Sequence, residues 1–272
     1  MSPALARRGF GWTFALGVLS LAGQMGARLK FVIVSLPRTG STYLVDYLDA
    51  VDGVRCLSEI FHPTGIMLRH HQPLDPRLLD MSLRDADPQD YLQRLEQEIG
   101  ECRWFGFKHF PRHGLPLLQQ LCASRAWRKI FLWRDNLLDQ YFSFLLASAH
   151  FGRTGWERVP DDVQMRVPVG MLLEDLHTIQ NNYFVIEKAL ALAHDGDVFA
   201  LEYEQLGQAA VMRGLLQFLG LPDPLVESAL AKTGTGEALR FARGPGPAQR
   251  IQNYDEVRSL LRSSRYRRWI DV

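Results

Sequence analysis

A short polar loop near the N-terminus carries the residue types that bind a phosphate group. Residues 35–42 (SLPRTGST) follow the apolar run 31–35 and precede a helical pattern. A loop between a strand and a helix presents backbone N–H groups and the positive end of the helix dipole to an anion. This loop adds a guanidinium, Arg38, and three hydroxyl groups: Thr39, Ser41 and Thr42. We expect it to bind an oxyanion.

The loop differs from the nucleoside-triphosphate pattern GxxxxGK[ST] at two positions. Ser35 stands at the first glycine, and Ser41 replaces the lysine that reaches the β- and γ-phosphates. The positive charge lies at Arg38 instead, which favours an anion with fewer charges and no metal ion. A P-loop phosphotransferase is an alternative to a loop that binds an anion without a metal. It is favoured by the segment IFLWRD, which resembles a Walker B strand with Asp135 as its carboxylate.

A second candidate anion site follows the apolar segment 129–133 (KIFLW). Arg134 stands at the end of this predicted strand, where a guanidinium can grip a phosphate through two N–H groups. Ser143 follows nine positions later, in a predicted helix over 136–150. A spacing of eight would select Phe142, and one residue turns a helical side chain by about 100°. A salt bridge from Arg134 to a neighbouring acid is the structural alternative.

Together these segments resemble the sulfotransferase superfamily, and the likeness extends over about residues 31–260. Each position of the family's first signature, Pro-(Lys/Arg)-(Ser/Thr)-Gly-(Ser/Thr)-(Ser/Thr), has a match: Pro37, Arg38, Thr39, Gly40, Ser41 and Thr42. The resemblance implies that this loop binds the 5′-phosphosulfate of 3′-phosphoadenosine 5′-phosphosulfate (PAPS). It also implies that Arg134 and Ser143 bind the 3′-phosphate, and that Arg243 (RGPG) lies in a segment that closes over the nucleotide. The nine-residue spacing resembles bacterial carbohydrate sulfotransferases of the nodulation-factor and trehalose types.

The resemblance implies sulfuryl transfer to a hydroxyl, with Arg38 stabilising the leaving oxygen and Lys108 facing the reacting sulfate. Two residues compete for the role of base. Glu59 (SEIFH) stands where carbohydrate sulfotransferases often carry a glutamate, and burial would raise its pKa toward neutrality. His109 (FKHFP) resembles the histidine of a Lys-Thr-His-Leu-Pro segment in cytosolic members. The structural alternatives are an ion pair from Glu59 to Arg38, a satisfied loop histidine and an ordinary surface lysine.

The elements that must position these residues alternate between strand and helix. Strands are predicted over residues 31–35, 54–57, 104–107, 129–133 and 198–202. Such alternation predicts an α/β fold, a P-loop-NTPase-like three-layer sandwich with a central parallel sheet flanked by helices. Ligands bind at the carboxyl ends of such strands, so all the candidate residues would meet at one edge. The Pro-, His- and Asp-rich residues 62–90 are expected to form a long loop or lid.

Composition excludes several other classes of protein. A net charge of +1 argues against a strongly cationic nucleic-acid binder. Three cysteines without CxxC spacing exclude a disulfide framework and a cysteine zinc site. His62, His70 and His71 lack the HExxH spacing, so no metal is expected. The arginines near the C-terminus suggest a solvated face, with a site for an anionic acceptor or membrane headgroups as the alternative.

Residues 1–30 form a separate N-terminal segment ahead of a domain over 31–272. Two arginines precede an apolar run over 9–23, as in a signal anchor, but the run is shorter than the ~20 residues that span a bilayer. A membrane tether, a helix on the fold and an upstream extension stay open, and a cytoplasmic location is expected with or without membrane association. The sequence thus predicts a sulfotransferase that uses PAPS as co-substrate and a hydroxyl acceptor, a carbohydrate or glycolipid. A P-loop phosphotransferase and a non-catalytic nucleotide-binding module are the alternatives.

Overall fold

The computed structural model describes residues 28–151, 159–235 and 247–270. These residues form one five-stranded sheet in the order β2-β3-β1-β4-β5, and all neighbouring strands are parallel. The strands are β1 (Leu29–Ser35), β2 (Val54–Leu57), β3 (Trp104–His109), β4 (Trp127–Trp133) and β5 (Val198–Glu202). All five predicted strands are confirmed. β1 begins two residues earlier than expected and β3 ends two residues later.

The central strand shows why the sequence forms a sheet covered on both faces. Phe31, Val32, Ile33 and Val34 are fully buried, and successive side chains of a strand point to opposite faces. Val32 and Val34 pack into one apolar cluster, whereas Phe31 and Ile33 pack into a second. A continuous apolar strand of this kind is typical of a parallel sheet between two layers of helices.

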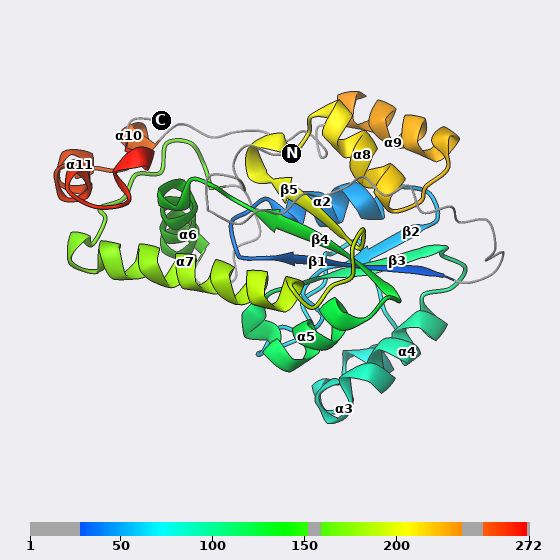
Figure 1. Ribbon diagram of the computed structural model, residues 1–272. Helices are drawn as coiled ribbons and strands as arrows, with labels where there is room; N and C mark the ends of the chain where they lie inside the picture. The colour runs from blue at the N-terminus through cyan, green and yellow to red at the C-terminus, as the bar shows by residue number, and fades with distance from the viewer. Residues whose placement is uncertain (1–27, 152–158, 236–246, 271–272) are drawn as a thin grey trace.

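Helices cover both faces of the sheet, so the predicted α/β three-layer architecture is confirmed (Figure 1). One layer contains α2 (Ser41–Asp49), α8 (Ala209–Phe218) and α9 (Asp223–Thr235). The other contains α4 (Pro88–Glu98), α5 (Leu115–Ala123), α6 (Leu137–Phe151) and α7 (Val169–Leu190). The helices after β1 and β3 lie on opposite faces, and such a reversal opens a crevice at the carboxyl ends of the strands.

The segment expected as a long loop, 62–90, is only partly a loop. It contains a 3-10 turn, η1 (Pro76–Leu79), the helix α3 (Met81–Ala86) and the start of α4. Asp75, Asp80 and Asp87 each accept a hydrogen bond from a backbone N–H at a helix start. Aspartate is a preferred N-cap residue, so these residues begin helices rather than interrupt them.

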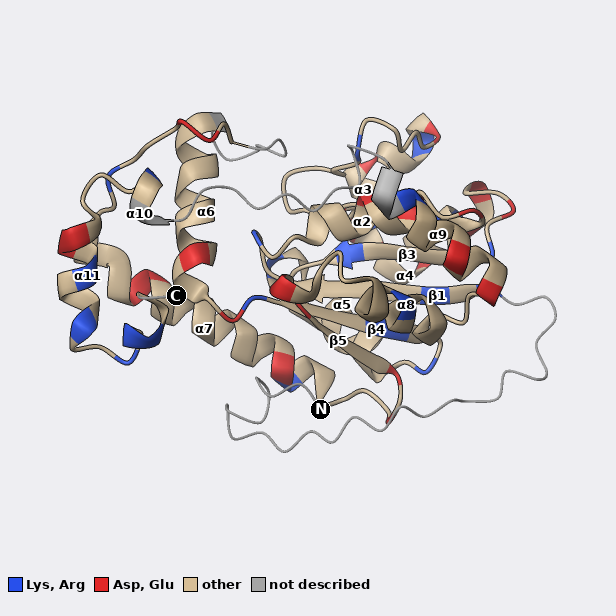
Figure 2. Ribbon diagram, turned by 90° about the horizontal axis from the view of Figure 1, so that it is seen from above, with Lys and Arg blue, Asp and Glu red and all other residues tan. Residues whose placement is uncertain are grey.

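The C-terminal part comprises α10 (Pro247–Arg250), α11 (Tyr254–Arg262) and the turn η6 (Arg267–Trp269), beside the end of α6 (Figure 2). The Arg28 side chain donates to backbone carbonyls of 96, 100 and 102, which ties this residue to α4 and to the loop before β3. Among the described residues, no helix has both the length and the apolarity needed to cross a bilayer. The apolar run 9–23 lies outside the described residues.

Candidate active site

The phosphate-loop candidate adopts a tight left-handed turn between β1 and α2. Arg38 has φ 66° and Gly40 φ 79°, and Arg38 is the one non-glycine residue with positive φ in the described part of the chain. Glycine takes this conformation freely, whereas arginine pays about 1–2 kcal/mol for it. The buried hydroxyl of Thr39 donates to Leu36 O at 2.9 Å. This hydroxyl, expected as a ligand donor, therefore holds the shape of the loop.

Arg38 and Ser143, which are 105 positions apart, meet at the end of the loop. Arg38 Nε donates to Ser143 Oγ at 2.9 Å, whereas Phe142 is buried in the apolar core. The nine-residue spacing from Arg134 therefore turns the serine toward the loop. Burial lowers the pKa of Arg38; Tyr203 opposes this shift, and the charge of Arg134 adds to it. A bound anion would relieve the repulsion between these two guanidinium groups.

Arg134 extends from the end of β4 into the same region. Its guanidinium lies over the Tyr203 ring, 4.1 Å from the centroid, and its Nη2 is 3.3 Å from Asp139 Oδ2. The side chain is largely buried, and Arg134 Nε has no acceptor among the described residues. The salt bridge considered as the structural alternative is thus present, but it uses only part of the guanidinium. Buried donors are almost always paired, so the unpaired Nε of Arg134 is a candidate donor to a ligand.

A chain of three hydrogen bonds, which sequence reasoning missed, joins the two anion-binding segments. Gln140 Nε2 donates to Pro37 O at 2.8 Å, and Tyr183 OH donates to Gln140 Oε1 at 2.9 Å. The backbone N–H of Arg134 donates to the same Tyr183 OH at 3.0 Å. Gln140 and Tyr183 are both buried, so these bonds fix the loop against the end of β4. One glutamine on the otherwise apolar inner face of α6 is the signal that sequence reasoning overlooked.

Lys108 and Glu59 form a buried ion pair beside the loop. Lys108 Nζ is 3.0 Å from Glu59 Oε1 and 3.3 Å from Thr42 Oγ1, and the lysine is 1% exposed. Burial lowers the pKa of Lys108, and the charge of Glu59 opposes that shift. The ordinary surface lysine is therefore excluded. Within the described chain Glu59 pairs with Lys108 and not with Arg38.

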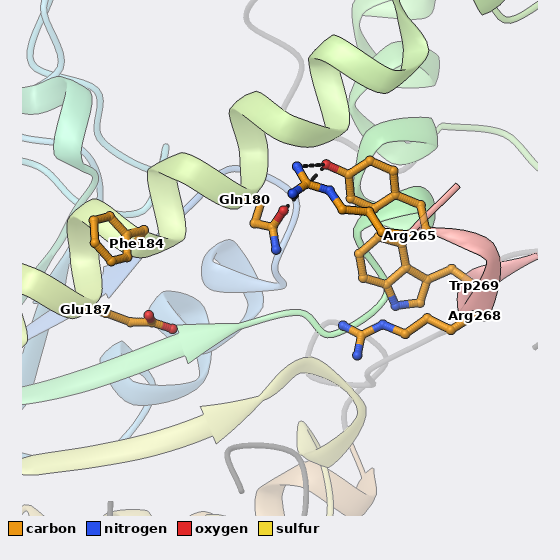
Figure 3. A pocket seen from close by; sticks show the side chains of 7 residues that line it. Gln180, Phe184, Glu187, Arg265, Arg268 and Trp269 are labelled. Carbon is orange, nitrogen blue, oxygen red and sulfur yellow. Dashed lines mark hydrogen bonds between the residues drawn. The ribbon is translucent and has the colours of Figure 1, made fainter. Parts of the chain in front are cut away.

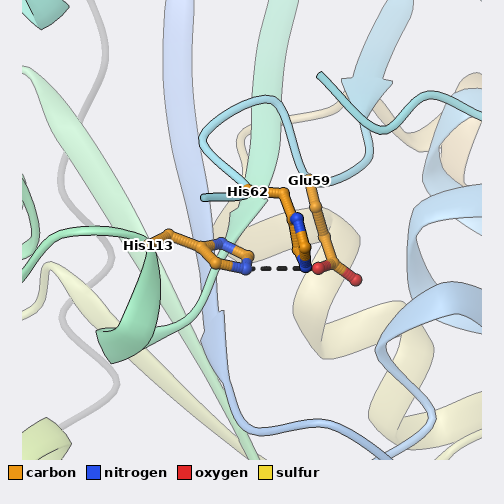
Figure 4. Close-up of side chains that lie close together, drawn as sticks. All are labelled: Glu59, His62 and His113. Carbon is orange, nitrogen blue, oxygen red and sulfur yellow. Dashed lines mark ion pairs between the residues drawn. The ribbon is translucent and has the colours of Figure 1, made fainter. Parts of the chain in front are cut away.

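Glu59 also contacts a second cluster that holds its charge. His113 Nε2 lies 3.2 Å from Glu59 Oε2 (Figure 4). Arg112 Nη2 lies 3.6 Å from the same oxygen. Burial alone would raise the pKa of Glu59, but the contacts with His113 and Lys108 outweigh it and lower that pKa to about 2. The expectation of a raised pKa was wrong, because the sequence did not reveal these partners.

His109 is fully buried on the opposite face of β3 from Lys108. Its Nε2 lies 3.2 Å from Gly114 O, and the aromatic rings of Phe61 and Phe107 are its neighbours. Burial, with the nearby His113, lowers the pKa of His109 to about 3. Its side chain makes no hydrogen bond or ion pair with the loop residues 35–42 in the described part of the chain. His109 is thus a neutral core residue, which the extension of β3 by two residues explains.

Three donor atoms near Glu59 have the spacing of a metal site but not its chemistry. Ligand atoms of Glu59, His62 and His113 lie within 4.8 Å of one another. The backbone N–H of Phe110 donates to His113 Nδ1 at 3.2 Å, so the neutral ring carries its proton on Nε2, toward Glu59. A metal ion needs the lone pair at that nitrogen, and Lys108 and Arg112 already supply positive charge. These residues do not fit a resident cation.

One predicted residue, Arg243, lies outside the described residues. Asp135, the candidate Walker B carboxylate, lies 3.5 Å from Arg268, and its side chain is 43% exposed. Its position at the surface does not suit a metal ligand beside the loop.

No family model matches the chain, and no curated protein matches its sequence. Its structure is similar to solved structures of sulfotransferases. One is the sulfotransferase from Alicyclobacillus acidocaldarius, 15% identical with a TM-score of 0.49, covering 86% of this chain and 91% of that one. Mouse sulfotransferase SULT7A1 complexed with PAP is 13% identical, with a TM-score of 0.43 and coverage of 89% and 75%. The sulfotransferase domain of the Synechococcus PCC 7002 olefin synthase is 17% identical, with a TM-score of 0.45 and coverage of 82% and 86%.

Proposed function

We propose that this protein is a sulfotransferase that moves a sulfuryl group from PAPS to a hydroxyl of a carbohydrate or glycolipid. The observation that carries the proposal is that two guanidinium groups, a half-buried one and a buried one, lie in one region and repel each other. Arg38 comes from the end of β1 and Arg134 from the end of β4, with Ser143 bonded to the first. Two separate cationic positions suit a donor with two anionic groups, a 5′-phosphosulfate and a 3′-phosphate.

The loop and the start of α2 would hold the 5′-phosphosulfate through backbone N–H groups and the hydroxyls of Ser41 and Thr42. Arg134 and Ser143 would hold the 3′-phosphate. Arg38 would exchange its bond to Ser143 for the bridging oxygen, where negative charge develops as the S–O bond of the donor breaks. The leaving nucleotide keeps that electron pair, the acceptor oxygen forms the new S–O bond, and a base removes the hydroxyl proton.

Glu59 is our candidate for the base. Its pKa of about 2 keeps it ionised near neutral pH, but such a carboxylate holds a proton weakly. Lys108 touches both Glu59 and the loop residue Thr42, so a sulfonate bound at the loop would draw the ammonium away from the carboxylate. Losing that partner raises the pKa of Glu59 when the donor is bound. His109 is less suited to act as the base, because its ring contacts the backbone carbonyl of Gly114.

Calorimetric titration with adenosine 3′,5′-bisphosphate tests the donor site. We expect tight binding to the wild type, loss of about 10-fold or more in affinity for Arg134→Ala, and no binding of ATP with Mg²⁺. Arg213→Ala is the matched control, because Arg213 is exposed on α8 and pairs with Glu227. Absence of bisphosphate binding would overturn the proposal.

A nucleoside-triphosphate phosphotransferase is the second candidate, and one observation favours it. Lys108 Nζ lies 3.3 Å from Thr42 Oγ1, so β3 brings an ammonium to the loop that lacks the usual lysine. A preference for ATP with Mg²⁺ in the same titration would support this candidate. The pairing of Lys108 with Glu59 weighs against it, because the ammonium is already neutralised.

A further inference from the structure

A hollow of about 340 Å³ lies between α7 and the C-terminal turn η6, apart from the phosphate loop (Figure 3). Gln180, Phe184 and Glu187 line it from α7, and Arg265, Arg268 and Trp269 from the C-terminal side. Its volume is in the lower part of the ~300–1,000 Å³ range of small-molecule sites. The expected solvent exposure of the C-terminal arginines is confirmed, and two of them line this hollow.

One end of the hollow contains a buried donor without a partner. Trp269 is only 5% exposed, and no described residue accepts a hydrogen bond from its Nε1. A buried N–H group left unpaired costs about 1–3 kcal/mol, so structures seldom retain one. In Figure 3 the indole nitrogen lies on the edge of the ring toward the Arg268 guanidinium. An acceptor that enters this end would satisfy the indole N–H.

Two further groups make this end a site for negative charge. The Arg268 guanidinium lies 4.7 Å from the Trp269 ring centroid. Its ion pair with Asp135 is 3.5 Å long, and both side chains are nearly half exposed, so a ligand can replace it at little cost. Gln180 Oε1 accepts from Tyr266 OH, which leaves the amide nitrogen of Gln180 as a donor on the other side (Figure 3). Indole, guanidinium and amide thus all offer N–H groups.

The other end of the hollow is aromatic and acidic. Phe184 is 48% exposed, and Lys188 Nζ lies over its ring, 5.0 Å from the centroid, so a ligand can pack only against the part of the ring that the lysine leaves open. Glu187 lies beside Phe184 on α7, and both are drawn apart from Arg268 and Trp269 (Figure 3). This separation orients a ligand: its anionic group faces the arginine end, away from the carboxylate, and its ring lies along Phe184.

We infer that this hollow binds an aromatic oxyanion, a planar ring that carries a phosphate, sulfate or carboxylate group. An oxygen of that group accepts from Trp269 Nε1 and pairs with Arg268, while the ring packs on Phe184. The inference does not depend on sulfuryl transfer, because none of these residues belongs to the loop or to the Arg134 site. Asp135 follows Arg134 directly, so the ligand would exchange a contact next to that site.

The test is a calorimetric titration of the full chain with phenyl phosphate, with inorganic phosphate and phenol as separate probes. We expect one saturable site that prefers phenyl phosphate to both fragments. Arg268→Gln should weaken binding by about 10-fold or more, since charge-assisted bonds are the strong ones. Arg267→Gln is the matched control, because Arg267 precedes Arg268 in η6 and is also charged and exposed but does not line the hollow. Trp269→Phe keeps an aromatic side chain and removes the donor, so a several-fold loss is expected; because the residue is buried, its melting temperature is measured alongside.

Three results would overturn the inference. The first is a dissociation constant above about 10 mM for phenyl phosphate, which means no specific site. The second is an equal loss in Arg267→Gln and Arg268→Gln, which means diffuse attraction to basic residues. The third is one-for-one displacement by adenosine 3′,5′-bisphosphate together with loss in Arg134→Ala, which assigns the binding to the other site.

Discussion

The candidate active site has two halves, one around Arg38 and Arg134 and one around Glu59 and Lys108, and they differ in how far their charges are paired. In the first half, Arg38 is half-buried and Arg134 is buried, and Arg134 Nε has no acceptor among the described residues. In the second half, Glu59 lies 3.0 Å from Lys108 and 3.2 Å from His113. In the described part of the chain, the first half has one carboxylate, Asp139, for its two guanidinium groups, whereas the charges of the second half pair with one another.

In the proposed mechanism, this difference separates the half that anchors the donor from the half that holds the candidate base. Buried charges are tolerated when paired, so an external anion gains most where the cations are underpaired. The half with Glu59 and Lys108 gains little free energy from binding an external anion, because its charges are already paired. It holds the carboxylate and the ammonium in fixed positions until a substrate replaces one of the two as the partner of the other. The proposed donor therefore anchors on the arginines, and its reacting group ends beside Lys108.

Removing Arg38 is expected to have the largest effect on turnover. Arg38→Ala should lower kcat for sulfuryl transfer by about 10²- to 10³-fold, because one donor to the developing charge is lost. Affinity for adenosine 3′,5′-bisphosphate, which lacks the sulfuryl group, should fall much less than in Arg134→Ala. Steady-state rates with labelled PAPS, together with calorimetry, separate the two effects.

The same comparison can fail in a recognisable way. If Arg38→Ala and Arg134→Ala lower bisphosphate affinity equally and leave kcat intact, both arginines only bind. Arg38 would then have no role at the leaving oxygen. Arg213→Ala again controls for the loss of one positive charge.

The self-neutralised half predicts a dependence of stability on pH. The pKa of Glu59 is lowered from 4.5 to about 2, so its contribution to stability is fully present above about pH 4.5 and is lost as the pH falls toward 2. The shift corresponds to roughly 3 kcal/mol. Urea unfolding at pH 6 and at pH 3 should show a larger loss of unfolding free energy for the wild type than for Glu59→Gln.

The comparison of the wild type with Glu59→Gln separates the contribution of Glu59 to the pH dependence from that of all other carboxyl groups. Glu256→Gln is a suitable control, because that exposed carboxylate has a pKa lowered by contacts with Asn253 and Arg166 but no burial. It should change the pH dependence by much less. Equal pH dependence in the wild type and Glu59→Gln would show that Glu59 is not held ionised by His113 and Lys108.

Much of the frame was predictable from the sequence, because it depends on local pattern. β-Branched and aromatic runs marked all five strands, and the loop at 35–42 was visible from its own residue types. The N-caps Asp75, Asp80 and Asp87 were misread because aspartate is common both in loops and at helix starts. Whether an aspartate lies in a loop or begins a helix depends on the backbone conformation of the residues that follow it.

The partners within the site were not predictable, because they depend on rotation and register. The extension of β3 by two residues sends Lys108 and His109 to opposite faces, and this alone separates the paired lysine from the core histidine. The contact of Glu59 with His113 requires the turn η2 (Pro111–His113) to fold back toward it. Gln140 and Tyr183 meet only after α6 and α7 pack together. No local pattern contains this information.

The smallest expected effect tests the register of α6. Ser143 Oγ accepts from Arg38 Nε at 2.9 Å in the first half of the site. Ser143→Ala should weaken bisphosphate binding by about 5-fold, which corresponds to the ~1 kcal/mol of an ordinary hydrogen bond. Ser148→Ala is the matched control, because five residues along the helix turn its side chain by about 140° to another face. Calorimetry on both variants measures the difference.

The direction of this effect distinguishes two roles for the serine. If Ser143 binds the 3′-phosphate, its loss weakens binding while Ser148→Ala has no effect. If Ser143 only holds Arg38 when the site is empty, its loss frees the guanidinium and bisphosphate affinity stays equal or rises. The second outcome would contradict the proposed donor contact and leave Arg134 as the sole 3′-phosphate residue among those the resemblance implied. The arginine half would then resemble the Glu59 half more closely, because it too would hold its cation in place until a ligand arrives.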